Sequence, residues 1–431
     1  MIRPMTSTTE RYDALVIGAG AGGLAAAALL SHRGYRTLLV ESRDRVGGRA
    51  SSHTTDDGYT VNTGAIAIEY GGPLEQVFKT VGAPFEIRIP EPATLFRIKG
   101  RDISLGKGPL GAIVNGALKR GAGILQSDDN ETSVKVWLSG YTKNETVHAI
   151  FRNLCAAIFA VNSDELPVRA FMTYFLQKGA FRNFGFSPTG TLGVMQGLAD
   201  TVTEVWLSSE VGDLHVHENR VTGVTVHRGG ETVEVEADVV VSNVGPHATT
   251  ELAGREHFDG AYLARLDSEL KPTANIVFNI ASDVPLMDAP GIITFGITRR
   301  LCNMANLTAT CPELAPPGKH LYVAYGVPIP AVGEFDEAAE IESTHQDLRD
   351  NFDGFDRNAQ ILSIKVMRGE WPAQRSIAGH DLPRETPLEN LWNVGDGNRE
   401  YADGGIQACA ESGRLAVDEI LKLHGEALTP R

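Results

Sequence analysis

The chain has 431 residues, of which 42% are hydrophobic and 22% charged, and its formal net charge is −15. This length allows two or three domains, and the composition is ordinary for a globular protein with a sizeable core. The acidic balance argues against a nucleic acid partner, because phosphate binding needs a basic surface. The 4 cysteines show neither a CxxC pair nor the spacing of zinc ligands, so we expect a reducing compartment and no metal site.

The start of the chain shows no secretory pattern, and no segment reaches the roughly 18 unbroken apolar residues of a transmembrane helix. We therefore expect a cytoplasmic protein.

The first strong motif spans residues 13–41. An apolar run typical of a buried strand leads into the glycine loop Gly18-Ala19-Gly20-Ala21-Gly22-Gly23, and an Ala- and Leu-rich helix follows. A second apolar strand ends at Glu41, which lies 23 residues after Gly18. This order is typical of a dinucleotide site, in which Gly18 allows a tight turn, Gly20 lets the backbone approach a pyrophosphate, and Gly23 lets helix and strand pack closely.

The acid at Glu41 has the offset of a carboxylate that binds ribose hydroxyls, which favours FAD or NAD over NADP. The residues that follow it, Arg43-Asp44-Arg45-Val46-Gly47-Gly48-Arg49, place a glycine pair between arginines. This stretch resembles the E-x-R-x-R-x-G-G-R motif of the flavin amine oxidase and phytoene desaturase superfamily. The resemblance implies FAD as the cofactor, with Glu41, Arg43, Gly48 and Arg49 as its neighbours.

A second motif lies near the end of the chain. Residues 391–396, Leu-Trp-Asn-Val-Gly-Asp, predict an apolar strand that ends in Gly395-Asp396, and a final helix begins near Gly404-Gly405-Ile406-Gln407. The carboxylate at such a strand end can accept hydrogen bonds from ribityl hydroxyls, and the helix N-terminus offers a positive dipole end. In the resembled family this is the closing FAD motif, to which Gly395, Asp396, Gly405 and Ile406 would belong.

The resemblance implies two further FAD neighbours. Gly64 ends a short strand that passes near the flavin ring in the family, and Val211 occupies the position of a valine that touches adenine. Between these motifs we expect a helix over 194–207, strands at 211–217, 221–227, 232–235 and 238–243, and an acidic, solvent-facing helix over 337–351.

The two motifs lie at opposite ends of the chain, so the cofactor domain must be discontinuous. The expected fold class is α/β: a Rossmann-like FAD-binding domain of the glutathione-reductase type with a discontinuous α+β substrate or cap domain. We expect the FAD-binding domain in residues 1–80, 190–255 and 385–431, and the substrate/cap domain in residues 81–189 and 256–384.

The expected chemistry is hydride transfer from a substrate carbon to flavin N5. The amino-acid sequences of segments 312–326 and 370–396 resemble the phytoene desaturase branch. This resemblance favours dehydrogenation or desaturation of an apolar, terpenoid-, carotenoid- or cyclic-ketone-like substrate. A flavin amine oxidase is the alternative, and a non-redox flavin-dependent isomerase or a flavin-binding interaction protein is a further one. No catalytic residue stands out.

No second dinucleotide motif and no CxxC is present, so electrons must pass directly to O2, a quinone or another diffusing acceptor. The glycine-rich stretch 106–125 predicts an entrance lip or an interfacial helix, and peripheral membrane contact is not the favoured interpretation. The Arg299-Arg300 pair predicts a surface turn, which is the interpretation we favour. The alternative is that the two arginines bind a substrate carboxylate.

Overall fold

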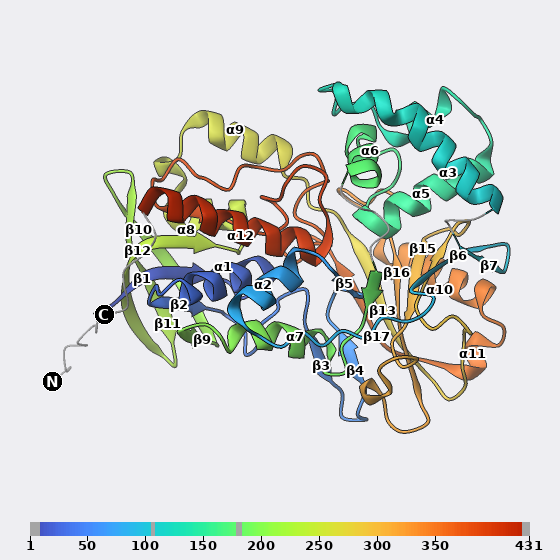
Figure 1. Ribbon diagram of the computed structural model, residues 1–431, viewed down its shortest axis with the longest axis horizontal. Helices are drawn as coiled ribbons and strands as arrows, with labels where there is room; N and C mark the ends of the chain where they lie inside the picture. The colour runs from blue at the N-terminus through green and yellow to red at the C-terminus, as the bar shows by residue number, and fades with distance from the viewer. Residues whose placement is uncertain (1–8, 105–107, 178–182, 425–431) are drawn as a thin grey trace.

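The computed structural model describes residues 9–104, 108–177 and 183–424, which form two lobes side by side (Figure 1). Each lobe is built on a seven-stranded sheet.

The sheet of the first lobe has the order β10-β11-β12-β1-β2-β9, with β18 paired to β12 beyond this path. Strands β9, β2, β1, β12 and β18 run parallel, while β10, β11 and β12 form an antiparallel meander. The strands are β1 (Thr9–Ile17), β2 (Thr37–Val40), β9 (Glu204–Trp206), β10 (Ser209–His217), β11 (Arg220–Arg228), β12 (Glu231–Ser242) and β18 (Leu391–Asn393). They come from three distant parts of the sequence, as a discontinuous α/β domain requires.

Both faces of this sheet are covered, which explains its unbroken apolar strands. Alternate residues of β1 face different cores: Ala14 and Val16 belong to one, and Leu15 and Ile17 to the other. The first core holds helices α1 (Ala21–His32), α2 (Pro73–Val81), α7 (Gly190–Ala199) and α12 (Gly405–His424). The second holds the meander with α8 (Pro246–Ala253) and α9 (Gly260–Glu269).

The glycine loop lets α1 pack closely on β1. Gly18 has φ +90°, a left-handed conformation that side chains disfavour. A Cβ added at Gly23 would lie 2.1 Å from the carbonyl oxygen of Gly18, so any side chain there would force the helix away from the strand.

The structure corrects two expectations in the middle of the chain. The helix expected over 194–207 ends at Ala199, and Glu204–Trp206 instead form edge strand β9 beside β2. The strands expected at 232–235 and 238–243 are one strand, β12, of which residues 231–236 pair with β11 and residues 234–242 pair with β1. A long strand that changes neighbours along its length has two different side-chain patterns, which local periodicity divides into two elements.

The sheet of the second lobe has the order β17-β13-β16-β15-β14-β6-β7. Its strands are β6 (Thr94–Ile98), β7 (Arg101–Ile103), β13 (Asn275–Ser282), β14 (Ile292–Phe295), β15 (Leu301–Asn306), β16 (His320–Gly326) and β17 (Ala359–Met367). One face packs against α10 (Glu337–Asn351) and α11 (Phe355–Asn358). Helices α3 (Gly108–Gly121), α4 (Val134–Ser139), α5 (Glu145–Phe159) and α6 (Val168–Gln177) gather at the other side of the lobe (Figure 1).

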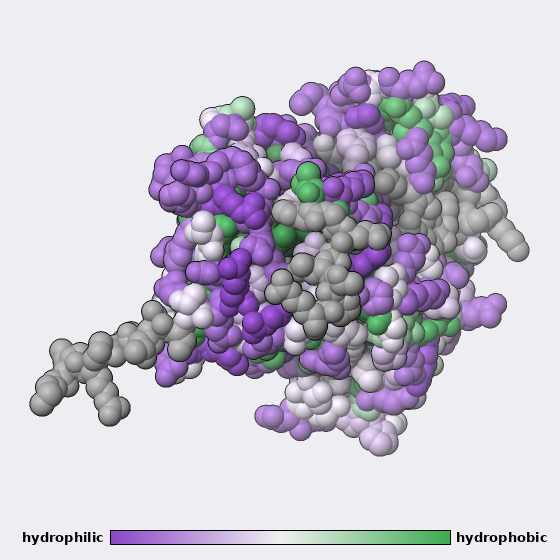
Figure 2. All heavy atoms as spheres, turned by 60° about the vertical axis from the view of Figure 1, so that its left-hand side comes forward, coloured by the Kyte–Doolittle hydropathy of each residue, from purple (hydrophilic) through white to green (hydrophobic). Residues whose placement is uncertain are grey.

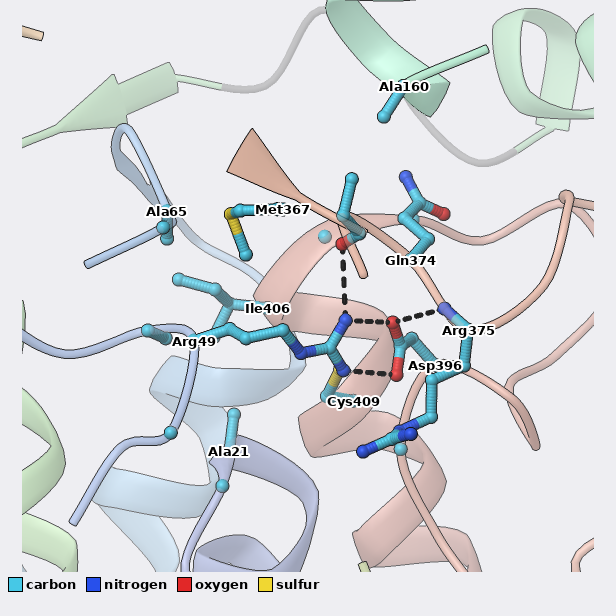
Figure 3. Close-up of a pocket in the computed structure, with 18 of the residues that line it drawn as sticks. Ala21, Arg49, Ala65, Ala160, Met367, Gln374, Arg375, Asp396, Ile406 and Cys409 are labelled. Carbon is cyan, nitrogen blue, oxygen red and sulfur yellow. Dashed lines mark hydrogen bonds and ion pairs between the residues drawn. The ribbon is translucent and has the colours of Figure 1, made fainter. Parts of the chain in front are cut away.

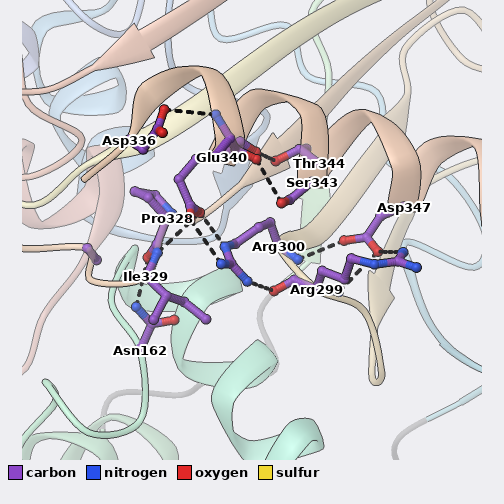
Figure 4. Close-up of polar contacts among 12 residues, drawn as sticks. Asn162, Arg299, Arg300, Pro328, Ile329, Asp336, Glu340, Ser343, Thr344 and Asp347 are labelled. Carbon is purple, nitrogen blue, oxygen red and sulfur yellow. Dashed lines mark hydrogen bonds and ion pairs between the residues drawn. The ribbon is translucent and has the colours of Figure 1, made fainter.

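Helix α10 is acidic but not simply solvent-facing, because Glu340 and Asp347 are buried. Asp347 accepts hydrogen bonds from the backbone N–H groups of Arg299 (3.0 Å) and Arg300 (2.7 Å) and pairs with the Arg299 guanidinium at 2.9 Å. The Arg300 guanidinium pairs with Glu340 (Figure 4). The arginine pair therefore holds a turn against α10.

On the face drawn in Figure 2, hydrophilic residues dominate and hydrophobic ones form small separate groups. Among the described residues, no helix combines the length and apolarity needed to cross a bilayer. Within the stretch 106–125, the described residues from Gly108 onward form α3 and a following 3-10 turn. Residues 105–107 and several α3 side chains lie outside the described part, so the entrance lip or interfacial helix stays a prediction, and membrane contact stays the interpretation that we do not favour.

Candidate functional site

One large cavity, about 1230 Å³ in volume, extends from the glycine loop of the first lobe to the sheet of the second. Its walls come from β1, β2, β10, α8 and α12 at one end, and from β6, β13, β14, β15, β16 and α5 at the other. We call these ends the cofactor half and the substrate half.

All residues expected to bind the cofactor line this cavity except two. Those that line it are Gly18, Gly20, Glu41, Arg43, Gly48, Arg49, Gly64, Val211, Gly395, Asp396, Gly405 and Ile406. Gly22 and Gly23 lie behind the cavity wall, where α1 packs: an added Cβ at Gly22 would lie 3.0 Å from the carbonyl oxygen of Cys409 in α12. The fold thus brings the two distant sequence motifs together.

A bidentate ion pair joins the two motifs at the centre of the cavity. Arg49 Nη2 lies 2.6 Å from Asp396 Oδ1, and Arg49 Nη1 lies 2.7 Å from Asp396 Oδ2 (Figure 3). Asp396 also accepts a hydrogen bond from the backbone N–H of Arg375 at 3.0 Å. Burial alone would raise the pKa of Asp396, but the Arg49 guanidinium beside it holds that pKa well below its ordinary value. The carboxylate is therefore ionised throughout the physiological range.

The Glu41 carboxylate is buried at the end of β2 and organises the glycine loop. It accepts hydrogen bonds from the backbone N–H groups of Ala19 (2.8 Å) and Arg43 (2.9 Å). Both oxygens retain lone pairs, so the group can still accept hydrogen bonds from a ligand.

Asn243, directly after β12, lies at the meeting point of the two motifs and was not among the expected site residues. With its amide nitrogen toward Val394, it donates to that carbonyl (3.3 Å) and accepts from the N–H of Gly20 (3.2 Å). A Cβ added at Gly20 would lie 2.4 Å from this amide, which explains the glycine. The sequence feature that could have identified Asn243 is that a polar residue follows the apolar strand at residues 239–241.

Arg375 was also missed. Its side chain is partly buried and lines the cavity, and its guanidinium makes no hydrogen bond or ion pair with any described residue. An added Cβ at Gly245, the residue before α8, would lie 2.7 Å from Arg375 Nε. Burial lowers the pKa of Arg375, and the nearby Arg49 lowers it further. Such a cation is suited to an anionic ligand.

Cys409 lines the cavity from α12 but is not a reactive thiol. Burial raises its pKa to about 12, and the Asp396 carboxylate adds to this effect. Among the described residues, no group of His, Cys, Asp and Glu side chains could hold a metal ion.

The substrate half is mainly apolar, with a few polar side chains on the second sheet. Tyr325 of β16 reaches across to the first lobe, where its hydroxyl donates to the carbonyl of Gly64. Burial raises its pKa, so the phenol is neutral. Met367 of β17 also lies at this junction, because its Cε would lie 3.2 Å from a Cβ at Gly64.

Comparisons with known proteins agree with this geometry. A family model described as flavin containing amine oxidoreductase matches residues 21–421. The chain is 21% identical over 462 residues to the 15-cis-phytoene desaturase (chloroplastic/chromoplastic) of Capsicum annuum, covering 96% of this chain and 78% of that protein. A solved oxidoreductase from Methanosarcina mazei matches with a TM-score of 0.82 and 26% identity, over 94% of this chain and 99% of that chain. A putrescine oxidase variant shares the fold, with a TM-score of 0.73 and 16% identity over 96% and 100% of the two chains.

The residues of the cofactor half fit FAD. The guanidinium of Arg375, which pairs with none of the described residues, and the N-terminus of α1, which begins at Ala21 in the cavity wall, both favour a pyrophosphate. The Glu41 carboxylate offers acceptors to ribose hydroxyls, and Asp396 offers them to ribityl hydroxyls.

Proposed function

The chain belongs to the family of flavin-containing amine oxidoreductases and is an FAD-dependent oxidoreductase, and we propose that it dehydrogenates or desaturates an apolar carbon skeleton, terpenoid-, carotenoid- or cyclic-ketone-like. When bound, FAD supplies the hydride acceptor at flavin N5. The protein's part is to bind the skeleton beside the cofactor, orient the C–H bond and exclude water. The electron acceptor in this proposal is O2, a quinone or another diffusing molecule.

The observation that carries this proposal is the apolar character of the substrate half. Four apolar residues of α5 line its wall, together with Ile292 of β14 and the aromatic residues Phe96, Phe175 and Phe184. Burial of an apolar skeleton against such a wall contributes roughly 25 cal/mol per Å² removed from water. The similarity to a phytoene desaturase over nearly the whole chain supports the same substrate class.

We propose that two units divide this work. Residues 1–80, 190–255 and 385–431 would bind FAD and position it with Gly18, Gly20, Gly22, Gly23, Glu41, Arg43, Gly48, Arg49, Gly64, Val211, Gly395, Asp396, Gly405 and Ile406. Residues 81–189 and 256–384 would enclose the substrate. In support, all strands of the first sheet fall in the first set of segments and all strands of the second sheet in the second.

Oxidation of an amine is the second candidate, favoured by the family match and by the fold shared with putrescine oxidase. The aromatic residue nearest the closing motif, Tyr401, gives it no support. Its hydroxyl donates to Asn130, the Arg169 guanidinium lies 4.6 Å from its ring centroid, and it does not line the cavity.

The two candidates separate in one experiment. FAD-loaded protein is mixed without oxygen with a terpenoid panel or an amine panel, and the loss of oxidised-flavin absorbance is followed. We expect bleaching by terpenoids and none by amines. Bleaching by amines alone would contradict the proposal, and bleaching by neither would favour the non-redox alternative.

A further inference from the structure

Gln374 lies where the cofactor half of the cavity meets the substrate half. Its neighbours in the chain are bound to the central ion pair: Arg49 Nη1 donates a hydrogen bond to the carbonyl of Ala373 at 3.1 Å. On the other side, Asp396 accepts a hydrogen bond from the N–H of Arg375 at 3.0 Å. The side chain of Gln374 lines the cavity and is 8% exposed. Its backbone position is therefore fixed by the same pair that joins the two sequence motifs.

A buried cation sets the direction of the Gln374 amide. Arg399, whose side chain is fully buried, donates a hydrogen bond from Nη1 to Gln374 Oε1. A guanidinium only donates hydrogen bonds, so the amide atom that faces it must be the oxygen. The amide nitrogen then points the other way, and Figure 3 shows it on the side of Ala160, away from the Arg49–Asp396 pair.

Arg399 is itself held by a network behind the cavity wall. Its Nε lies 2.7 Å from Asp381 Oδ1, and its Nη2 donates to the carbonyl of Ser376 at 2.8 Å. Asp381 also accepts hydrogen bonds from the Ser376 hydroxyl (2.9 Å) and the N–H of Gly379 (3.1 Å). Asp381 thus supplies the opposite charge that a buried guanidinium needs. Because neither Arg399 nor Asp381 lines the cavity, the network acts there only through the amide of Gln374.

The Gln374 nitrogen is a donor that a ligand can reach. It makes no hydrogen bond to a described residue, and it is not among the buried polar atoms that are closed off from solvent. Asn275 and Asn303 also line the cavity, and Asn303 lies opposite Thr294 of β14. Their amide oxygens have no partner in the described part of the chain, but both are enclosed and therefore out of reach of a ligand.

The chemistry of this amide restricts its partner. Because Arg399 occupies Oε1, the side chain can only donate a hydrogen bond into the cavity. The Arg399 charge also polarises the amide, which makes its N–H groups stronger donors. The oxygens of ketones, aldehydes and alcohols can all accept such a bond. A pure hydrocarbon would leave the donor buried without a partner, and a site of this kind rejects an analogue that lacks the matching group.

We propose that Gln374 donates a hydrogen bond to an oxygen atom of an otherwise apolar substrate, and that Arg399 is the positioning residue that holds this donor in place. The inference rests on the proposed function, because it takes the substrate half as the place of the carbon skeleton. It narrows the substrate class from any apolar skeleton to one that carries an oxygen. The direction of the amide, toward Ala160 at the end of α5, favours the substrate over the cofactor as the acceptor.

The test uses FAD-loaded protein and two pairs of probes that differ only in one carbonyl group: menthone with menthane, and geranylacetone with the hydrocarbon in which CH2 replaces its carbonyl. Dissociation constants are taken from the immediate change in flavin absorbance on anaerobic mixing. For at least one pair we expect the ketone to bind wild-type protein about tenfold more tightly than the hydrocarbon. Gln374→Met should weaken ketone binding about tenfold and leave hydrocarbon binding within about threefold.

Two further variants separate hydrogen bonding from shape and from folding. Met367→Leu changes the shape of the same junction without changing its hydrogen-bonding capacity, so it should leave the ketone preference within about threefold. Arg399→Lys keeps the charge beside Asp381 but loses the planar fork that reaches Gln374. It should reduce the ketone preference, whereas a residue that served folding alone would weaken both probes equally. FAD content and the thermal midpoint confirm that each variant is folded.

Three outcomes would overturn the inference. The first is that wild-type protein binds neither ketone more tightly than its hydrocarbon. The second is a ketone preference that Gln374→Met leaves unchanged. The third is a Gln374→Met variant that shifts the absorbance and midpoint potential of the ligand-free flavin while the ketone preference persists, because the donor would then serve the cofactor. Ketone binding that depends on Gln374 without any flavin bleaching would instead contradict the proposed function alone.

Discussion

The two halves of the cavity are built in different ways. The cofactor half depends on backbone and on short consecutive motifs: the glycine loop before α1, the arginine-rich stretch after Glu41, and the Gly395-Asp396 strand end. The substrate half depends on single side chains, one from each strand, that strand register brings into a row. The residues of the cofactor half are therefore close together because they are neighbours in sequence motifs, whereas those of the substrate half are close together because their strands pair.

Because of this difference, the two halves contribute unequally to the stability of the fold. In the cofactor half, the Arg49–Asp396 pair links segments 347 positions apart in the chain, so it contributes to folding as well as to the site. In the substrate half, Asn303 makes one long side-chain hydrogen bond to a described residue, to the carbonyl of Ala157 at 3.4 Å, so it contributes little to the fold. Substitutions in the two halves should therefore have distinguishable effects on stability and binding.

The largest effect is expected from Arg49→Met. It leaves the Asp396 carboxylate buried without its partner, which should lower the free energy of unfolding by about 3–5 kcal/mol and weaken FAD retention. Urea denaturation and the flavin content of purified protein measure the two effects. The double variant Arg49→Met with Asp396→Leu should recover most of the stability but not the FAD. Recovery of both would mean that the pair serves the fold alone.

The pH dependence of this effect has a definite sign. The folded-state pKa of Asp396 is depressed, so the pair's stabilisation is fully present above the unfolded carboxyl pKa of about 3.9 and is lost as the pH falls toward the folded value. The stability difference between wild type and Arg49→Met should therefore narrow below about pH 4. A difference that stays constant down to pH 3 would contradict the assigned ionisation.

The sequence could predict the cofactor half because its determinants are local. The strand over 37–40, the helix over 337–351 and the start of the last helix at Gly405 follow from runs of neighbouring residues. Asn303 and Thr294 could not be placed, since their proximity depends on the pairing of β14 with β15. Arg375 and Asn243 were missed for the same reason: each is a single polar residue whose partners lie far away in the sequence.

A smaller effect is expected in the second lobe, from Asp347→Asn. This carboxylate accepts backbone hydrogen bonds from the turn at Arg299, and an amide would direct its own N–H groups at some of these donors. We expect the free energy of unfolding to fall by about 1–3 kcal/mol, with FAD affinity unchanged. Asp350→Asn, at an exposed carboxylate that pairs with the same arginine at 2.6 Å, is the control and should change stability by less than about 0.5 kcal/mol. A loss of FAD affinity in Asp347→Asn would show that the turn against α10 in the second lobe is coupled to the cofactor half of the cavity.

The smallest of these effects is expected from Arg375→Met, and it falls on binding rather than on folding. The Arg375 guanidinium has no partner among the described residues, so its removal should leave the stability of the FAD-free protein about unchanged. If it pairs with the pyrophosphate, its removal should weaken FAD binding about tenfold, which equals roughly 1.4 kcal/mol. Fluorescence titration of FAD-free protein with FAD measures this affinity. Arg368→Met is the matched control, because Arg368 pairs with Glu334 at 2.9 Å and does not line the cavity. Equal FAD affinity in wild type and Arg375→Met would remove Arg375 from the cofactor site and leave the helix N-terminus as the main anion-binding element.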